Sequence, residues 1–394
     1  MSTPPARPEA MRRHNLGLVL REIHRNGALT RAELTARLGM SRSTIGALVS
    51  DLAELDLLRE SVPNGGTRAG RPSYVVGPHD AGPYVVAVDV DVTQVTTAAV
   101  GIGGTVLARH VITIDEPPPS PEFVAQLIVE ALPCLQKAIE HHGGPESIGV
   151  SVPGTVDRDS GTVKVAPNLE WYDATFGAHL SELLDHSVPV VVGNDADLAV
   201  LAEHNRGAAR DCADVVYLIG RIGVGAGIIA DGAQLRGRDG HAGEIGHNVV
   251  DSTGPACHCG KHGCLETYVG ASALLGAAGR PGPATGTRVR SVISDAYAGD
   301  VVATDAVRTV ARALGRGLAG VVNMLNPEQV ILGGTLTDVL ALARDDLESS
   351  LGQYALEPPY ETVQLVAPEF GDDSAMLGAA EIAFAGLLEN PGRR

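Results

Sequence analysis

The sequence has few aromatic residues, and this limits how its cores can be built. Aromatic side chains make up 3% of the 394 residues, with a single tryptophan. Valine, leucine, isoleucine and alanine must therefore fill the interior, a composition that suits helices packed on sheets. Hydrophobic residues make up 44% of the chain, which is enough for two or three domains with real cores and argues against a disordered chain.

The chain also lacks the apolar segments of secreted and membrane proteins. Its first residues, MSTPPARPEAMRR, are not followed by a signal-peptide apolar region, and no apolar run reaches about 18 residues. We therefore expect a cytoplasmic protein with no membrane partner. Thiols stay reduced there, so a tight cysteine cluster predicts a metal site rather than disulfides. Two of the five cysteines, Cys134 and Cys212, stand alone and are expected to be buried thiols.

Positive charge is scarce and unevenly distributed. The chain has 30 Lys and Arg against 47 Asp and Glu, a formal net charge of -17. The first 80 residues hold eleven arginines and eight acidic residues, so this head carries about +3 and the remainder about -20. A basic head before an acidic body leaves nucleic-acid binding open for the head alone.

The head has the pattern of a winged helix-turn-helix. Thr30 and Glu33 have the spacing of a capping box, which begins a short helix after an earlier amphipathic one. Gly39 makes the turn, and Ser41 caps the next helix. The segment 57–78 then has the composition of a β-wing and a basic Gly/Pro linker.

This pattern predicts DNA contacts at the start of the second helix of the motif and in the wing, which would reach the major and minor grooves. The predicted DNA-binding residues are Ser41, Arg42, Ser43, Thr44, Arg68 and Arg71. Arg42 is expected to be the principal contact. A helical protein-interaction module is the alternative, but the capping box, turn glycine and basic wing together favour DNA.

Beyond about residue 80, β-branched strands alternate with alanine-rich helices, which predicts an α/β body. The expected strands cover 84–92, 96–102, 105–114, 147–156, 188–195 and 326–334, with a hairpin over 215–232. The expected helices cover 121–143, 196–207 and 374–389.

The other three cysteines lie together in the segment GEIGHNVVDSTGPACHCGKHGCLE, residues 243–266. One imidazole and three thiolates with the spacing H-x9-C-x-C-x4-C form a closed tetrahedral ligand set, which indicates structural zinc. The predicted ligands are His247, Cys257, Cys259 and Cys264. The neighbouring His258 and His262 are expected to be solvated. A chance cluster of thiols is the alternative interpretation.

Several motifs together resemble the ROK family, which groups bacterial sugar kinases with sugar-responsive repressors. The motifs that follow the helix-turn-helix are PGTVD (153–157), GND (193–195), EIGH (244–247), CHCGKHGCLE (257–266) and NPEQVILGG (326–334). The resemblance implies a two-lobed actin-like or hexokinase-like (ribonuclease H-like) body behind the winged helix-turn-helix. The expected domains are a head at 1–80 and a body at 81–394, with lobe 1 at 81–192 plus the C-terminal helix 374–394, and lobe 2 at 193–373.

The resemblance also implies a sugar site, in which carboxylates accept strong hydrogen bonds from hydroxyls. The implied sugar-binding residues are Gly154, Asn168, Asn194, Asp195, Glu244, His247 and Glu266. The family's zinc ligands fall on the same histidine and three cysteines already named. Asp195 matches the catalytic base of the kinases. A cap for the helix that follows is its alternative role, and the two roles can coexist.

The two phosphate-binding turns of ROK kinases are altered in this sequence. Asp91 and Val92 stand where the first turn has two glycines, and Ile222 replaces a threonine in the second turn, Arg221–Gly227. An added acid and lost donors predict weak ATP binding.

The expected function is therefore not enzymatic. We expect a sugar-responsive repressor of carbohydrate-utilisation genes, which binds operator DNA as a homodimer or homotetramer. A ROK-type ATP-dependent sugar kinase with an added DNA-binding head is the main alternative. A regulator that responds to a protein partner or to no ligand is the third.

Overall fold

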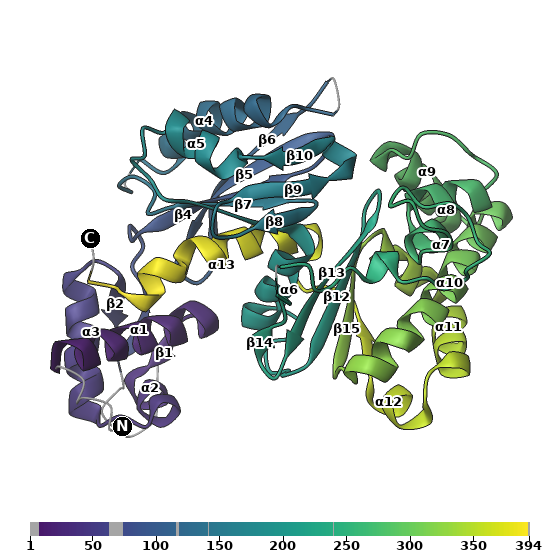
Figure 1. Cartoon of the computed structure of the whole chain (residues 1–394). Helices are drawn as coiled ribbons and strands as arrows, with labels where there is room; N and C mark the ends of the chain where they lie inside the picture. The colour runs from purple at the N-terminus through teal and green to yellow at the C-terminus, as the bar shows by residue number, and fades with distance from the viewer. Residues whose placement is uncertain (1–7, 63–73, 116–117, 141, 239, 393–394) are drawn as a thin grey trace. The chain divides into compact units, whose positions relative to one another are not determined.

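The computed structural model describes residues 8–62, 74–115, 118–140, 142–238 and 240–392 (Figure 1). The chain forms two compact units. Unit 1 comprises Met1–Ser151, Thr175–Val192 and Ala379–Arg394, and unit 2 comprises Val152–Ala174 and Gly193–Gly378. Within the described ranges, no helix combines the length and the apolar character needed to cross a membrane.

The head is a winged helix-turn-helix and belongs to unit 1. Its helices are α1 (Pro8–Asn26), α2 (Arg31–Leu38) and α3 (Arg42–Glu54), and its strands are β1 (Leu29–Thr30), β2 (Leu58–Ser61) and β3 (Val75–Pro78), in the antiparallel order β1-β3-β2. The predicted capping box at Thr30 and Glu33 is present, and Gly39 has the left-handed φ of 62° that ends α2. The predictions for Arg68 and Arg71 fall on residues that lie outside the described ranges.

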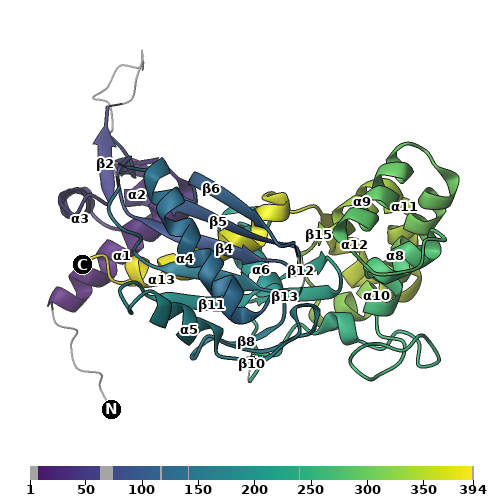
Figure 2. The ribbon, with the colours of Figure 1, turned by 90° about the horizontal axis from the view of Figure 1, so that it is seen from above.

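The body part of unit 1 is built on a five-stranded sheet with order β11-β7-β4-β5-β6. Its strands are β4 (Tyr84–Val90), β5 (Gln94–Gly101), β6 (Val106–Thr113), β7 (Ile148–Val152) and β11 (Val190–Asn194). Helices α4 (Pro121–Ala138) and α5 (Phe176–Leu183) cover one face, and α13 (Ser374–Glu389) covers the other (Figures 1 and 2). A Cβ on Gly149 of β7 would lie 2.0 Å from the carbonyl oxygen of Ala379, so α13 rests directly on the strand backbone.

Unit 2 repeats this topology in its own five-stranded sheet, β14-β13-β12-β15-β16. Its strands are β12 (Val215–Gly220), β13 (Val224–Ala230), β14 (Ala233–Gln234), β15 (Gln329–Gly334) and β16 (Gln364–Val366). In both sheets an antiparallel meander is extended from its first strand by a parallel partner, β7 beside β4 and β15 beside β12. Helix α6 (Asp195–Arg206) packs on β12 and β13.

The remaining elements of unit 2 are a small antiparallel sheet and a set of helices. The sheet contains β8 (Thr155–Asp157), β9 (Thr162–Ala166) and β10 (Trp171–Ala174), with the short helix η1 (Pro167–Leu169) before β10. The helices are η2 (Ile245–His247), α7 (Glu266–Val269), α8 (Ala271–Ala277), α9 (Gly286–Tyr297), α10 (Val301–Leu325), α11 (Thr335–Tyr354), α12 (Glu357–Thr362) and η3 (Gly371–Asp373). The unit's large buried cluster is aliphatic, as the composition predicted.

The structure differs from some local predictions, and the helix expected over 121–143 ends at Ala138. The strand expected over 147–156 is two strands, because Gly154 has a φ of 137° that breaks the extended run between β7 and β8. Cys134 is exposed and Cys212 half-buried, although both were expected to be buried. Cys134 lies outside the buried stripe of α4, and Cys212 lies in the turn between α6 and β12.

Candidate functional site

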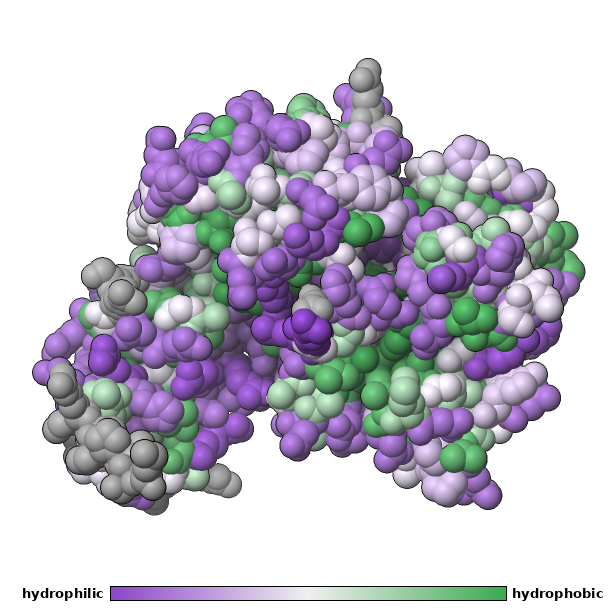
Figure 3. All heavy atoms as spheres, in the orientation of Figure 1, coloured by the Kyte–Doolittle hydropathy of each residue, from purple (hydrophilic) through white to green (hydrophobic). Residues whose placement is uncertain are grey.

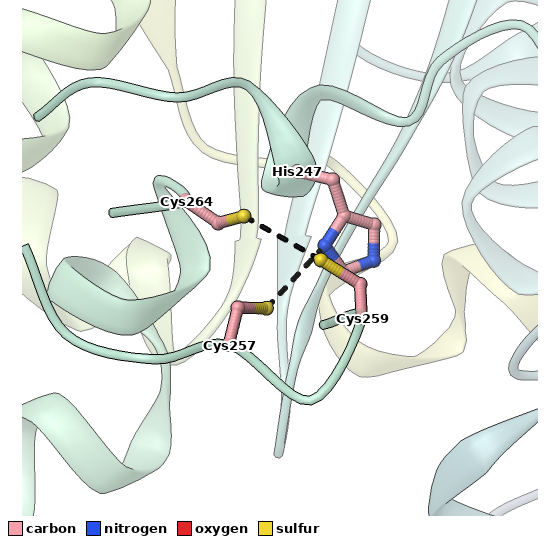
Figure 4. Close-up of side chains that lie close together, drawn as sticks. All are labelled: His247, Cys257, Cys259 and Cys264. Atoms are coloured by element: carbon pink, nitrogen blue, oxygen red, sulfur yellow. Dashed lines mark hydrogen bonds between the residues drawn. The ribbon is translucent and has the colours of Figure 1, made fainter. Parts of the chain in front are cut away.

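The four predicted metal ligands lie together in unit 2. The ligand atoms of His247, Cys257, Cys259 and Cys264 all fall within 4.8 Å of one another, and the side chains point toward a common centre (Figure 4). The sulfur of Cys257 is 3.7 Å from Nδ1 of His247, and the sulfurs of Cys259 and Cys264 are 3.6 Å apart. Tetrahedral zinc with thiolate bonds of about 2.3 Å would space its sulfurs by about 3.7 Å. The group is therefore compatible with zinc.

Two glycines allow the backbone to fold around this group. Gly260 and Gly263 have φ values of 83° and 68°, and a Cβ on Gly263 would lie 1.5 Å from the carbonyl oxygen of Asp251. Burial raises the pKa of Cys264 to about 12, and the neighbouring cysteine side chains add to this rise. A metal would therefore displace the proton of a thiol that is neutral near pH 7 when no metal is bound.

Each carboxylate oxygen of Glu266, at the start of α7, has a polar partner. Its Oε2 accepts a 2.9 Å hydrogen bond from the amide of Val224, and its Oε1 lies 2.9 Å from Nδ1 of His258. His258 is 46% exposed, in keeping with the expectation that it is solvated, and its contact with Glu266 was not predicted. A Cβ on Gly223 would lie 2.4 Å from Oε2 of Glu266 and 3.7 Å from Nδ2 of Asn168. The loop before β13 thus brings two predicted sugar-binding residues together.

Glu244 lies against the same strand, β13. Two nearby glycines pack on the backbone of β13. A Cβ on Gly243 would lie 2.5 Å from the carbonyl oxygen of Ala226, and one on Gly246 would lie 2.3 Å from that of Val224. The Glu244 side chain is 52% exposed, and its Oε2 lies 4.0 Å from Nε2 of His247. His247 thus directs Nδ1 toward the metal group and Nε2 toward Glu244.

At the start of α6, Asn194 and not Asp195 is the N-cap. Its Oδ1 accepts a 2.9 Å bond from the amide of Asp197, and its Nδ2 donates to the carbonyl oxygen of Gly154 at 2.8 Å. Asp195 is the first helical residue, is 5% exposed, and accepts from the amide of Ala196 at 2.9 Å. The capping role that the sequence suggested for Asp195 therefore belongs to its neighbour.

The predicted sugar-binding residues are thus connected through α6 and β13 within unit 2. A Cβ on Gly225 of β13 would lie 3.8 Å from Oδ1 of Asp195, and one on Gly227 would lie 2.3 Å from the carbonyl oxygen of Ala196. Both glycines belong to the segment that resembles a phosphate-binding turn, and Gly227 is required by the close approach of α6 to β13.

A buried polar cluster that sequence reasoning missed adjoins this region. Nη1 of Arg158 donates to Oε1 of Gln234, whose Nε2 donates to the carbonyl oxygen of Asp197. Burial raises the pKa of Asp197 to about 6, the positive charge of Arg158 opposes this shift, and the charge of Glu244 adds to it. Arg158 directly follows the PGTVD motif, and this position was the available signal.

The segment that resembles the first phosphate-binding turn of ROK kinases, which contains Asp91 and Val92, lies in unit 1. The side chain of Asp89 is buried and accepts a 2.8 Å bond from the hydroxyl of Ser151. Oδ1 of Asp91 accepts from the amide of Val92 at 2.5 Å. The Asp91 carboxylate thus accepts a hydrogen bond from a backbone N–H group, and phosphate-binding turns present such groups to their ligand.

In the head, four of the six predicted DNA-binding residues, Ser41 to Thr44, lie at the start of α3. The hydroxyl of Ser41 accepts from the amide of Thr44 at 3.1 Å and lies 2.9 Å from that of Ser43, and the Arg42 side chain is exposed. Hydrophilic side chains predominate on the face of the head seen in Figure 3.

A groove of about 450 Å³ adjoins the start of α3, and the sequence did not predict it. It is lined by Met11, Arg12, Asn15, Ser43, Thr44, Ala47 and Leu48. The first turns of α1 therefore share a surface with the predicted recognition residues.

Comparison with known proteins places this geometry in a family. The sequence model described as "ROK family" matches residues 85–385, and that described as "MarR family" matches residues 17–68. The chain belongs to the ROK family. Among its relatives, the xylose repressor of Bacillus subtilis is 26% identical over 95% of this chain and 96% of its own length.

Two solved structures extend the comparison. A ROK family transcriptional regulator, a homologue of the E. coli MLC protein, has a TM-score of 0.78 and 27% identity over 96% of this chain and 97% of its own. A ROK family glucokinase from Streptomyces griseus, in complex with glucose and AMPPNP, has a TM-score of 0.67 and 29% identity, covering 76% of this chain and 98% of its own. The winged helix and the ROK body of this chain thus match those of a regulator over almost its whole length.

Proposed function

We propose that this ROK protein is a transcriptional repressor whose operator affinity is set by a sugar bound in unit 2. The observation that carries the proposal is the grouping of Asp195, Glu244 and Glu266 around α6 and β13, in a chain that begins with a winged helix-turn-helix. Carboxylates bind sugar hydroxyls strongly, and the relatives include a xylose repressor. Binding at a palindromic operator would require a homodimer or homotetramer.

Zinc would serve structure and not chemistry in this scheme. Three thiolates and one imidazole leave no open position on a tetrahedral ion, so the ion would order the loop between η2 and α7. His247 would then hold the metal through Nδ1 and could donate to a sugar oxygen or to Glu244 through Nε2. The ordered loop would fix Glu266 at the start of α7.

We further propose that the segment resembling the first phosphate-binding turn of ROK kinases does not bind ATP tightly in this protein. The carboxylate of Asp91 takes the amide of Val92 and adds negative charge where a triphosphate would bind. The two effects together should weaken ATP binding by on the order of 1 to 3 kcal/mol. Asp195 would then bind a sugar hydroxyl without acting as a catalytic base.

A thermal-shift screen of neutral sugars on the zinc-loaded protein tests the proposal. We expect one member of a panel that includes glucose, xylose and N-acetylglucosamine to raise the melting temperature by at least about 2 °C at saturation. Glu244→Ala should abolish the shift, and Glu348→Ala, which changes a partly exposed acid on α11 to alanine, should preserve it. A shift that is unchanged in Glu244→Ala would contradict the assigned site.

The likeness to the Streptomyces griseus glucokinase supports one alternative, a sugar kinase that carries a DNA-binding head. Asp195 is retained at the position of the family's base. A coupled ATPase assay across the same sugars distinguishes the two functions, since turnover of about 1 per second or faster would establish the kinase. We expect no such turnover.

A further inference from the structure

His24 of the head is buried against the body in unit 1. Its side chain and that of Glu381 on α13 are 2% and 3% exposed, and Nε2 of His24 lies 3.2 Å from Oε1 of Glu381. The other ring nitrogen, Nδ1, accepts a 3.1 Å bond from the amide of Gly103, in the turn between β5 and β6. Because a backbone amide can only donate, Nε2 must carry the ring proton and donate it to Glu381.

The contact between α1 and α13 continues along one face of each helix. A Cβ on Gly17 would lie 2.6 Å from the carbonyl oxygen of Leu388, and Nη1 of Arg21 donates to the same oxygen at 3.2 Å. Positions 17, 21 and 24 recur at helical spacing, as do 381 and 388 on α13. The two helices lie side by side in both views (Figures 1 and 2). The head is therefore docked on α13 through its first helix.

The opposite end of α13 is fixed to α6 inside unit 2. The hydroxyl of Ser374, the first residue of α13, donates at 2.7 Å to Oε1 of Glu203, a fully buried residue near the end of α6. Oε2 of Glu203 accepts from the amides of Ala208 and Glu369 at 2.8 and 3.1 Å. A Cβ on Gly378 would lie 1.9 Å from the carbonyl oxygen of Leu198, so α13 and α6 are in backbone contact.

We infer that α13 transmits the state of the sugar site to the DNA-binding head, with His24 as the positioning residue at the head. This inference rests on the proposed function. Helix α6 begins at Asp195, in the proposed site, and α13 runs without interruption from Ser374 in unit 2 to Glu389 in unit 1. A shift of α6 on sugar binding moves the start of α13, and the far part of that helix carries α1 with it.

The contact between His24 and Glu381 is better suited to positioning α1 on α13 than to stabilising the fold. A buried ion pair or charged hydrogen bond contributes little net stability compared with apolar packing, but it fixes one arrangement of the groups that it joins. Removing one partner leaves a buried charge without its bond. His24 and Glu381 thus define how α1 sits on α13, and the position of α1 determines the position of the recognition helix α3, which packs against it.

Hydrogen exchange of the full-length, zinc-loaded protein tests the inference without an operator sequence. Glucose, xylose and N-acetylglucosamine are added one at a time. In the native protein, a sugar that slows exchange at the start of α6 and in the loop 247–266 should also change the exchange of the α1 amides by at least about fivefold. Gly17→Ala, which forces α1 off Leu388 without creating a buried charge, should keep the protection of the site and lose the α1 response. His24→Leu should behave in the same way.

Ser147→Ala is the matched control, because it removes another buried hydrogen bond of α13, the 2.7 Å bond from Ser147 to the carbonyl oxygen of Ala383, and leaves the head contact intact. It should retain the α1 response. Protection of the site with unchanged α1 exchange in the native protein, or an α1 response that survives in Gly17→Ala, would overturn the role of α13 and leave the sugar site standing. If no sugar protects the loop or α6, the proposed function itself fails.

Discussion

Gly223 lies directly against the carboxylate of Glu266: a Cβ at this position would come within 2.4 Å of Oε2. The amide of the next residue, Val224, donates to the same oxygen at 2.9 Å. The glycine is therefore required by the side chain that we assign to sugar binding, and it offers a way to disturb that side chain without removing its charge.

Gly223→Ala should weaken sugar binding by at least about tenfold, because the added methyl group displaces Glu266 and breaks its bond to Val224. Zinc content should not change. Gly320→Ala is the matched control, since a Cβ at this exposed site on α10 meets nothing within 4 Å. Calorimetric titration with the sugar found by thermal shift measures the effect. Equal sugar affinities in the two variants would refute the assigned position of Glu266.

Removal of the metal should loosen the loop between η2 and α7. We expect a strong chelator to lower the melting temperature by at least about 5 °C and to abolish sugar binding, because metal binding and local folding are coupled. Cys264→Ser should give the same result with less than one zinc per chain by elemental analysis. Cys134→Ser, at an exposed cysteine outside the group, should keep the zinc. An unchanged melting curve after the metal has been stripped would contradict the structural role.

The raised pKa of Asp197 gives a pH dependence with a defined sign. Burial raises this pKa from 3.8 to about 6, so the carboxyl is more easily protonated in the folded state. Its contribution to stability is fully present below about pH 4 and is lost as pH rises through 6. Asp197→Asn, which resembles the protonated form, should exceed the native protein in unfolding free energy by on the order of 3 kcal/mol at pH 8, with the difference vanishing near pH 4. Urea unfolding at both pH values measures it.

The control for that experiment is Asp345→Asn, which alters an exposed carboxylate on α11. Its effect should be within about 0.5 kcal/mol at either pH. A native protein as stable as Asp197→Asn at pH 8 would show that Arg158 fully compensates the buried charge.

Arg42→Ala should weaken operator binding, since Arg42 is exposed at the start of the recognition helix. If Arg42 contacts a phosphate, the slope of log K against log salt should fall by about 1, and if it contacts a base, discrimination at one position should drop by about 1 to 3 kcal/mol. Arg290→Ala removes the same charge from an exposed site in unit 2 and should change neither. An operator selected from random DNA serves as the probe. Unaltered binding by Arg42→Ala would remove this residue from the interface.

Local patterns allowed much of the head and the metal group to be predicted. The capping box of Thr30 and Glu33 and the turn at Gly39 depend on residues a few positions apart, and the structure contains both. The His and Cys ligands are likewise close in sequence, so their spacing alone constrains their geometry. The ROK motifs then indicated the topology of the body.

Long-range contacts could not be read from the sequence. The bond between His24 and Glu381 joins residues 357 positions apart, and no local pattern distinguishes that histidine from an exposed one. The contact of the exposed His258 with Glu266 was not predicted for a similar reason, because it depends on the fold of the loop. Capping was considered as an alternative role for Asp195, whereas Asn194 is the N-cap, since both side chains can cap a helix and only backbone geometry separates them.

The most direct test of the account measures operator affinity across the sugar panel, with the reciprocal titration of sugar into protein with and without operator. We predict that one neutral sugar changes the operator dissociation constant by at least about fivefold, and that saturating operator changes the affinity for that sugar by the same factor. An operator affinity that no sugar alters, together with ATP-dependent phosphorylation of one of those sugars, would contradict the account.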